Sequence, residues 1–266
     1  MQYKNKNKRK KMVVEAIVIS VTMVFALASN MYGHNIQIAL ADTKNNNSPT
    51  RTSSSSSNPN QMSSSPAASS SSTDKATKLV LALRDLWADH TGWTRNYIIS
   101  FVAGLPDTNF AAQRLLKNQV DIGNAIKPFY GNIAGDKLTS LLKDHIMGAV
   151  DLLKAAKAGN TTGAAAAEKK WYENADQIAT FLSSANPNWS KVALKSMLDN
   201  HLALTKSEAV ARLTGNYAAD ITAYDKVRQE ANMMSDTLVD GIVKQFPGKF
   251  ASSVGTITTA NPTISK

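Results

Sequence analysis

The sequence predicts an all-α fold: an up-and-down bundle of about six helices, built from three related helical hairpins. Apolar residues recur every three to four positions through most of residues 74–250, which is the period of an amphipathic helix. No segment shows the apolar–polar alternation of a half-buried strand. Glycine, proline and helix-capping residues divide the pattern into segments of similar length, which suits antiparallel neighbours joined by short turns.

The first two predicted helices form the first hairpin. The first helix begins at Asp74, a candidate N-cap, and ends at Gly104. Asp107 is a candidate N-cap for the second helix. The second helix ends within the run KPFYG, residues 127–131, because Pro128 disfavours helix in the residue that precedes it.

The other four helices form two further hairpins. Asp136 opens the third helix, Gly159 closes it, and Ser190 is a candidate cap for the fifth. These four helices are predicted over residues 136–158, 164–184, 192–213 and 217–246. The run TGN at 214–216 indicates a turn between the last two, and the alternative is one continuous helix.

Residues 1–41 have the layout of a secretory signal peptide. Six basic residues come first, an apolar run follows over 12–28, and small-residue cleavage sites come next. Cleavage fits after Ala28 or after Ala41, and we favour Ala41. The alternative is an uncleaved membrane anchor. However, Glu15 leaves only roughly 13 uninterrupted apolar-rich residues, fewer than the ~20 that span a bilayer.

The rest of the chain divides by composition into three parts. Residues 42–73 are dominated by Ser, Asn and Pro, which predicts a disordered spacer. Residues 74–250 are predicted to form the helical-bundle domain, and residues 251–266 a disordered polar tail without an apolar anchor.

Charge and cysteine content exclude several functions. The chain carries a net charge of +10, but the predicted signal peptide holds six basic residues and one acidic residue. The remaining chain therefore has 24 basic and 19 acidic residues, too diffuse an excess to predict nucleic-acid binding. The absence of cysteine excludes disulfides, thiolate metal ligands and a cysteine nucleophile.

Three histidines recur at almost constant spacing. The runs LWADH, LLKDH and MLDNH end at His90, His145 and His201, at intervals of 55 and 56 residues. Each histidine continues an apolar stripe, so each is expected to face the core. Asp121 and Asp176 each follow a histidine by 31 residues, which should return them to about the same height on the antiparallel helix. The sequence predicts one polar layer of these five residues.

This layer has two interpretations, a metal-binding site and a structural feature. Helix bundles bind metals through side chains that project inward, and imidazole with carboxylate suits zinc, copper, nickel or iron. No Glu-x-x-His or His-Glu-x-x-His pattern accompanies the histidines, however. In the structural interpretation, which we favour, each histidine hydrogen-bonds an aspartate of the neighbouring helix and fixes the register of the bundle.

Other polar residues near the layer are secondary candidates. In the third hairpin, a turn at Gly215 would bring Arg228 or Gln229, and no aspartate, to the height of the layer. The run WTRNY, residues 93–97, could present its rings and arginine to a glycan, although core packing is the favoured interpretation. The secondary candidates are Asp89, Asp144, Asn200, Arg95 and Glu208.

Several longer motifs resemble a family of exported all-helical proteins from Gram-positive spore-forming bacteria. The resemblance covers roughly residues 79–250 through the motifs LWADHTGWTRNYIIS, NQVDIGNAIKPFYG, LLKDHI, KKWYENADQIATFLSSANPNW, MLDNHLALT and SDTLVDGIVKQFP. Similar sequences are often called glycosyltransferase or acetylglutamate kinase. These names do not fit the residues, because a nucleotide-sugar transferase needs an α/β sheet and a kinase needs a phosphate-binding site. The resemblance supports the domain limits and implies no catalytic residue.

Together these observations predict a secreted protein, which could associate with the cell wall, that binds a metal, a small ligand or a cell-envelope component. The alternatives are a metal-dependent extracytoplasmic enzyme that uses the polar layer, and a purely structural or interaction protein. Catalysis is the less favoured role. After signal cleavage we expect no stable membrane anchor, and we make no prediction of oligomeric state.

Overall fold

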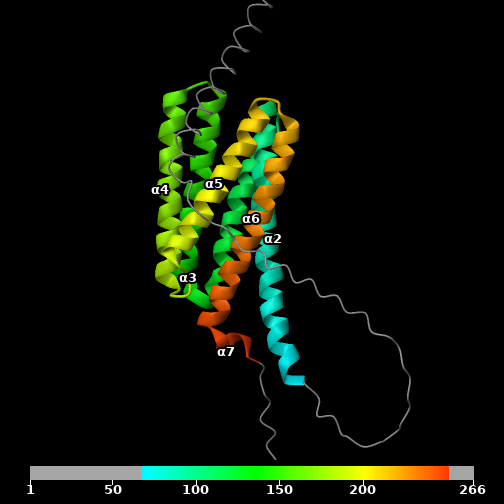
Figure 1. The fold of residues 1–266 in the computed structure, drawn as a ribbon, viewed down its shortest axis with the longest axis vertical. Coiled ribbons are helices and arrows are strands. Elements are labelled where there is room, and N and C mark those ends of the chain that lie inside the picture. The colour runs from blue at the N-terminus through cyan, green and yellow to red at the C-terminus, as the bar shows by residue number, and fades with distance from the viewer. Residues whose placement is uncertain (1–66, 252–266) are drawn as a thin grey trace, which may run out of the picture. The chain divides into compact units, whose positions relative to one another are not determined.

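The computed structural model describes residues 67–251, which are almost entirely α-helical and contain no strand within that range (Figure 1). The helices are α2 (Ala67–Ala103), α3 (Thr108–Lys157), α4 (Thr161–Ala185), α5 (Lys191–Leu213), α6 (Tyr217–Gln245) and the single turn α7 (Pro247–Phe250). The predicted all-α bundle is confirmed. The predicted signal peptide, residues 42–66 of the spacer, and the tail from residue 252 lie outside the described residues.

Helix α3 consists of two helices joined at a sharp break. Gly131 has φ +80°, a left-handed conformation that glycine adopts without strain, and it separates a first half (108–130) from a second half (132–157). The prediction of a helix end within KPFYG was right, but its stated cause was wrong. Pro128 lies inside the helix, and the break comes three residues later at the glycine.

The two halves of α3 approach each other closely beyond this break. A Cβ atom added to Gly123 would lie 2.6 Å from the carbonyl oxygen of Gly135, closer than real side chains pack. The pair of glycines therefore lets the backbones of two successive hairpins meet. This contact joins the first hairpin to the second.

The three hairpins turn in the same way. Gly104, Gly159 and Gly215 have φ of 70°, 72° and 75°, and each ends a helix. In each turn the residue after the glycine donates its N–H to a carbonyl five residues earlier at 2.9 Å, the bond that defines a Schellman motif. Because Gly215 closes α5 and Asn216 caps α6, helices α5 and α6 are separate.

Local capping differs from the prediction at three residues. Asp136 lies inside the second half of α3, which starts at residue 132, so it does not open that helix. Asp74 lies within α2, which begins at Ala67, so it is not the N-cap. Residues 67–73, which were predicted as part of the disordered spacer, belong to the same helix. Asp107 occupies the N-cap position of α3 but its side chain makes no capping hydrogen bond. Ser190 does cap α5, because its hydroxyl oxygen accepts from the N–H of Ala193.

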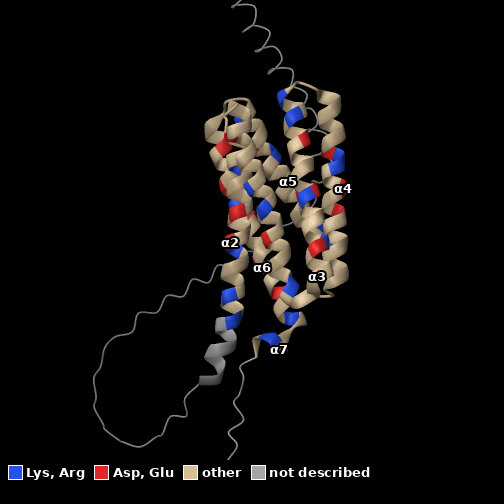
Figure 2. Cartoon of the chain, turned by 180° about the vertical axis from the view of Figure 1, so that it is seen from behind, with Lys and Arg blue, Asp and Glu red and all other residues tan. Residues whose placement is uncertain are grey.

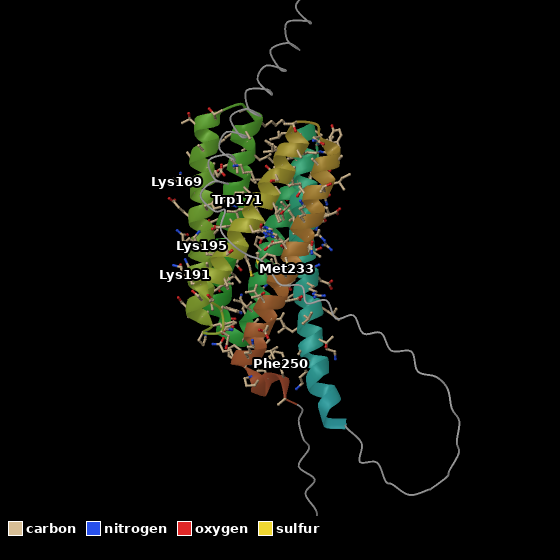
Figure 3. All side chains as sticks on the ribbon, in the orientation of Figure 1. Lys169, Trp171, Lys191, Lys195, Met233 and Phe250 are labelled. Atoms are coloured by element: carbon tan, nitrogen blue, oxygen red, sulfur yellow. The ribbon has the colours of Figure 1, made fainter. Side chains whose placement is uncertain are left out.

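The hairpins pack into a closed ring of helices. Helix α2 packs against the first half of α3, α4 against α3, and α5 against α6; α4 also packs on α5, and α6 closes the ring against α2 (Figure 1). Charged residues of both signs are interspersed along the helices (Figure 2). Lys169, Lys191 and Lys195 extend outward from the bundle (Figure 3).

The core consists of two apolar clusters. The larger contains 21 buried residues, including Leu138, Leu142 and Leu198, and the smaller contains seven, including Leu115 and Leu153. Along α2 and the second half of α3, the layer histidine lies between the residues of the two clusters. On α5, His201 lies between Leu198 and Leu202 of the larger cluster, and the α5 residues that pack against the smaller cluster, Ala209 and Leu213, come later. The histidines therefore occupy the boundary inside the core.

Candidate functional site

The three repeated histidines come together in the core. His90, His145 and His201 are 3%, 4% and 4% exposed. The ring centroid of His201 lies 5.7 Å from that of His90 and 6.3 Å from that of His145. Helices α2, α3 and α5 thus bring residues that are 55 and 56 positions apart in sequence into one group.

The two aspartates of the predicted layer lie outside this group. Asp121 pairs with Lys117 on its own helix, with 2.8 Å between Oδ1 and Nζ, and its side chain is 29% exposed. Asp176 is 46% exposed and lies 4.0 Å from Nζ of Lys191. Neither contacts a histidine. The predicted His–Asp pairing is therefore wrong.

Each histidine instead bonds a residue 29 positions later through its Nδ1 atom. Nδ1 of His90 is 3.2 Å from Nε2 of Gln119, and Nδ1 of His145 is 3.0 Å from Oδ1 of Asn174. In the third hairpin, Nδ1 of His201 is 2.8 Å from Oε2 of Glu230. Glu230 therefore occupies the position for which Arg228 or Gln229 was predicted. We call these three pairs the histidine layer.

The turn glycines carry the signal that would have found these partners. Gly104, Gly159 and Gly215 each follow a layer histidine by 14 residues, so an equal path back reaches a residue about 29 positions after the histidine. The prediction used a spacing of 31. An error of two residues rotates a side chain by about 200° around a helix, which moves it from the core to the surface.

Hydrogen bonding assigns the proton of His90 to Nε2. The amide nitrogen of Gln119 donates to the carbonyl oxygen of Leu115 at 2.8 Å and to Oδ1 of Asn118 at 3.1 Å, so the atom that faces His90 is a nitrogen that carries hydrogens and cannot accept. Nδ1 of His90 must accept, which leaves the ring proton on Nε2. Burial, followed by the charges of His201 and His145, holds the pKa of His90 well below its usual 6.5, so the ring is neutral.

His145 has the opposite tautomer. The amide nitrogen of Asn174 donates to the carbonyl oxygen of Leu141 at 3.0 Å, so its Oδ1 atom faces His145. Nδ1 of His145 therefore carries the proton and donates it, while Nε2 has a free lone pair. Burial first, and then the charge of His201, lower the pKa of His145 to about 3.

His201 pairs with the carboxylic group of the layer. Both side chains are about 95% buried, and a proton lies between Nδ1 and Oε2 of Glu230. The other oxygen of Glu230, Oε1, is buried without a hydrogen-bond partner in the described part of the chain. Trp87 packs edge-on against His90 and Trp171 packs against His145, each with 5.4 Å between ring centroids.

The donor arrangement does not match a three-histidine metal site. A histidine that binds a metal donates its other ring N–H to an acceptor. His145 and His201 have such acceptors, but Gln119 presents an N–H to His90. Among residues 67–251, no group of three or more histidine and carboxylate side chains is placed to hold a metal ion.

A second buried polar cluster joins α2, α5 and α6. Nη1 of Arg95 lies 2.8 Å from Glu208 and 2.7 Å from Asp220, and both carboxylates are 1% exposed. Burial raises the pKa of Glu208 to about 7, although the hydrogen bond and charge of Arg95 oppose this rise. The guanidinium also lies over the ring of Tyr224 at 4.7 Å. Arg95 is therefore engaged inside the bundle and is not presented to a glycan.

The other secondary candidates lie outside the layer. Asp89 forms an ion pair with Arg114 near the surface, with 2.5 Å between Oδ2 and Nη2. Asp144 and Asn200 are exposed. They precede the histidines in sequence and therefore point about 100° away from the core face.

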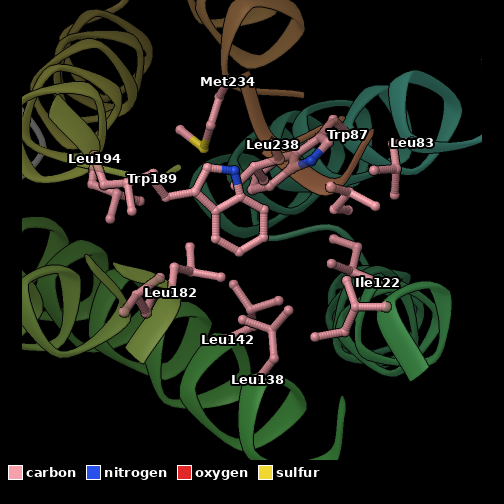
Figure 4. Close-up of a pocket in the computed structure, with 14 residues that line it drawn as sticks. Leu83, Trp87, Ile122, Leu138, Leu142, Leu182, Trp189, Leu194, Met234 and Leu238 are labelled. Atoms are coloured by element: carbon pink, nitrogen blue, oxygen red, sulfur yellow. The ribbon is translucent and has the colours of Figure 1, made fainter. Parts of the chain in front are cut away.

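An apolar cavity lies on the side of the layer toward α7, inside the larger cluster. Its volume is about 40 Å³, and its walls come from α2, both halves of α3, α4, α5, α6 and Trp189 of the α4–α5 turn. Trp189 lies between Met234 and Leu142 in this lining (Figure 4). Gly241 leaves room for the indole, because a Cβ atom there would collide with Nε1 of Trp189. Trp87 lines the cavity and also contacts His90.

Comparisons with protein-family models, with curated proteins and with solved structures find no match to this chain. Within residues 67–251, no helix combines the length and apolar character that a membrane crossing needs.

Proposed function

We propose that this chain is an exported binding protein whose helical bundle takes a small apolar ligand into its central cavity. The supporting observation is the cavity lining. Every long helix contributes apolar side chains to it, and the only nitrogen or oxygen atoms among the lining side chains are the indole nitrogens of Trp87 and Trp189. Apolar cavities in proteins stay dry and bind apolar guests such as xenon or benzene.

The cavity volume limits the size of the ligand. One buried water molecule needs about 10–15 Å³ of cavity volume, so a cavity of about 40 Å³ admits roughly three or four non-hydrogen atoms. Short hydrocarbons, short alcohols and dissolved gases fall in this class. A ligand of the size of benzene requires side chains such as Met234 or Leu238 to move, and methionine adapts most readily to such a change.

Two other parts of this proposal rest on the sequence. The predicted signal peptide of residues 1–41 supports export, and the part of the predicted spacer that precedes α2, residues 42–66, supports a position near the cell wall. The metal-dependent enzyme has less support, since Gln119 holds His90 in a tautomer that cannot bind metal through Nε2.

Xenon is the probe for this proposal. In the full chain with ¹³C-labelled methyl groups, xenon pressure should shift the signals of Leu142 and Leu198, which line the cavity. It should leave Leu153, in the smaller cluster, unchanged. A short alcohol such as 1-propanol should compete with xenon for the same signals. If no cavity methyl responds to xenon, the cavity is not a binding site and the proposal fails.

Two matched variants separate binding from general packing. Leu142→Phe and Leu153→Phe make the same change on the second half of α3, at residues that are both 4% exposed. Only Leu142 lines the cavity. We expect Leu142→Phe to abolish the xenon response and Leu153→Phe to keep it. A xenon response that survives Leu142→Phe unchanged would place the guest elsewhere.

A further inference from the structure

The histidine layer leaves one ring nitrogen of each histidine without a partner. All three hydrogen bonds of His90, His145 and His201 within the described residues use Nδ1. The three histidines lie in the core, and 3–4% of the surface of each residue is accessible to a water-sized sphere. Buried polar atoms are nearly always paired with protein or with ordered water.

The free nitrogens present both a donor and an acceptor. His90 carries its proton on Nε2, because Nδ1 accepts from Gln119. His145 has an unprotonated Nε2, because Nδ1 donates to Asn174. A metal ion needs acceptors only, and an anion needs donors only. A water molecule satisfies both groups at once.

The separation of His145 and His201 fits a shared water molecule, and that of His90 and His201 lies between the values for water and for a metal. Water at a hydrogen-bond distance of about 2.8 Å from two Nε2 atoms, at its own angle of roughly 105°, puts the ring centroids about 6.3 Å apart. A tetrahedral zinc ion at about 2.1 Å from each nitrogen would draw the centroids to about 5.3 Å. The centroids of His145 and His201 are 6.3 Å apart, and those of His90 and His201 are 5.7 Å apart.

We propose that the three layer histidines hold one water molecule at the centre of the bundle. The water accepts a hydrogen bond from Nε2–H of His90 and donates one to Nε2 of His145. Its third hydrogen bond goes to Nε2 of His201, which it can make as donor or as acceptor. The three hairpins are therefore joined through one shared ligand, in addition to their apolar contacts.

The test is NMR of the full chain with ¹⁵N-labelled histidine, in which long-range ¹H–¹⁵N correlations show which nitrogen carries the proton. We expect His90 to be neutral and protonated on Nε2, and His145 to be neutral and protonated on Nδ1. A cross-peak between a long-lived water and Nε2–H of His90 should also be present. Both tautomers reversed or equal, or no such water, would overturn the proposal. Zinc or copper bound at near one equivalent by the unmodified chain would also overturn it.

A matched pair of variants tests the role of the partner residues. Gln119→Glu replaces the donor with an acceptor, so the proton of His90 should move to Nδ1 and the water cross-peak to this proton should disappear. Asn174→Asp keeps an acceptor at its position, so His145 should stay protonated on Nδ1. A His90 proton that stays on Nε2 in folded Gln119→Glu would contradict the inference. The spectra of the unmodified chain decide the proposal even if that variant does not fold.

Discussion

At the scale of single residues, each layer histidine depends on one partner from the other helix of its hairpin. Asn174 accepts from His145 and donates to the carbonyl oxygen of Leu141, so both polar atoms of its side chain are hydrogen-bonded inside the core. Removal of one partner from such a pair costs the desolvation of the other. Replacement of both by apolar residues of similar shape costs much less. The pair is therefore suited to a double-mutant cycle.

We expect His145→Leu to lower the free energy of unfolding by about 1–3 kcal/mol, because it leaves Oδ1 of Asn174 buried and unpaired. The double variant His145→Leu/Asn174→Leu should lose less than the sum of the two single variants. Urea denaturation of all four proteins measures both effects. Additive losses would show that the hydrogen bond contributes no coupling energy.

The pKa of His145 predicts how stability depends on pH. This pKa is about 3 in the folded chain and 6.5 in the unfolded chain, so the unfolded chain binds the proton first as pH falls. The contribution of His145 is fully present above pH 6.5 and is lost between pH 6.5 and about 3, at about 1.4 kcal/mol per pH unit.

The raised pKa of Glu208 acts in the opposite direction. Its pKa is about 7 in the folded chain against a usual 4.5, so Glu208 lowers the free energy of unfolding as pH rises from 4.5 to about 7. This change partly offsets that of His145. Glu208 is present in both the unmodified chain and His145→Gln, so its effect cancels in the difference between their free energies of unfolding. We expect that difference to shrink as pH falls from 6.5 to 4, measured by urea denaturation at each pH. A constant difference would contradict the low pKa of His145.

At the scale of helices and turns, the helix ends and the break in α3 occur at glycines with positive φ. Gly131 has φ +80° and open space where a Cβ would be, so a larger residue there would strain only the backbone. Gly248 also has open space but lacks a positive φ. Gly131 combines φ +80° with ψ 172°, a region open almost only to glycine. We therefore expect Gly131→Ala to cost about 1–3 kcal/mol and Gly248→Ala almost nothing, as measured by thermal unfolding. Equal losses would show that backbone strain at the break is unimportant.

The same elements show why helix ends were easier to predict than the partners of the histidines. Gly159 and Ser190 mark helix ends through local backbone chemistry, which the sequence shows directly. The inward position of the histidines followed from the apolar stripes. Which residue of the neighbouring helix faces a histidine depends on the length of the turn as well. An error of two residues in the predicted spacing gave Asp176 in place of Asn174. The tautomer of His90 also requires the second hydrogen bond of Gln119, which no spacing in the sequence indicates.

At the scale of the whole bundle, the histidine layer divides the core into two unequal parts. Among the described residues, the cluster toward α7 has 21 buried members and the cluster toward the three glycine turns has seven. The smaller part also contains the buried polar side chains of Arg95, Glu208 and Asp220, which bury less apolar surface than aliphatic side chains would. Free energy gained from burial scales with apolar area, so the two parts should differ in local stability.

We therefore expect native-state hydrogen exchange to change at the layer. The second half of α3 provides an internal comparison, because Leu138 and Leu142 belong to the larger cluster and Val150 and Leu153 to the smaller. The amides of Val150 and Leu153 should exchange through openings of lower free energy, while the amides of Leu138 and Leu142 should open only on global unfolding. The dependence of each rate on denaturant distinguishes the two kinds of opening. If all four amides exchange at the same free energy, the bundle unfolds as one unit. The layer would then couple the two clusters, because breaking one hairpin away from the shared centre would disrupt the hydrogen bonds of the other two.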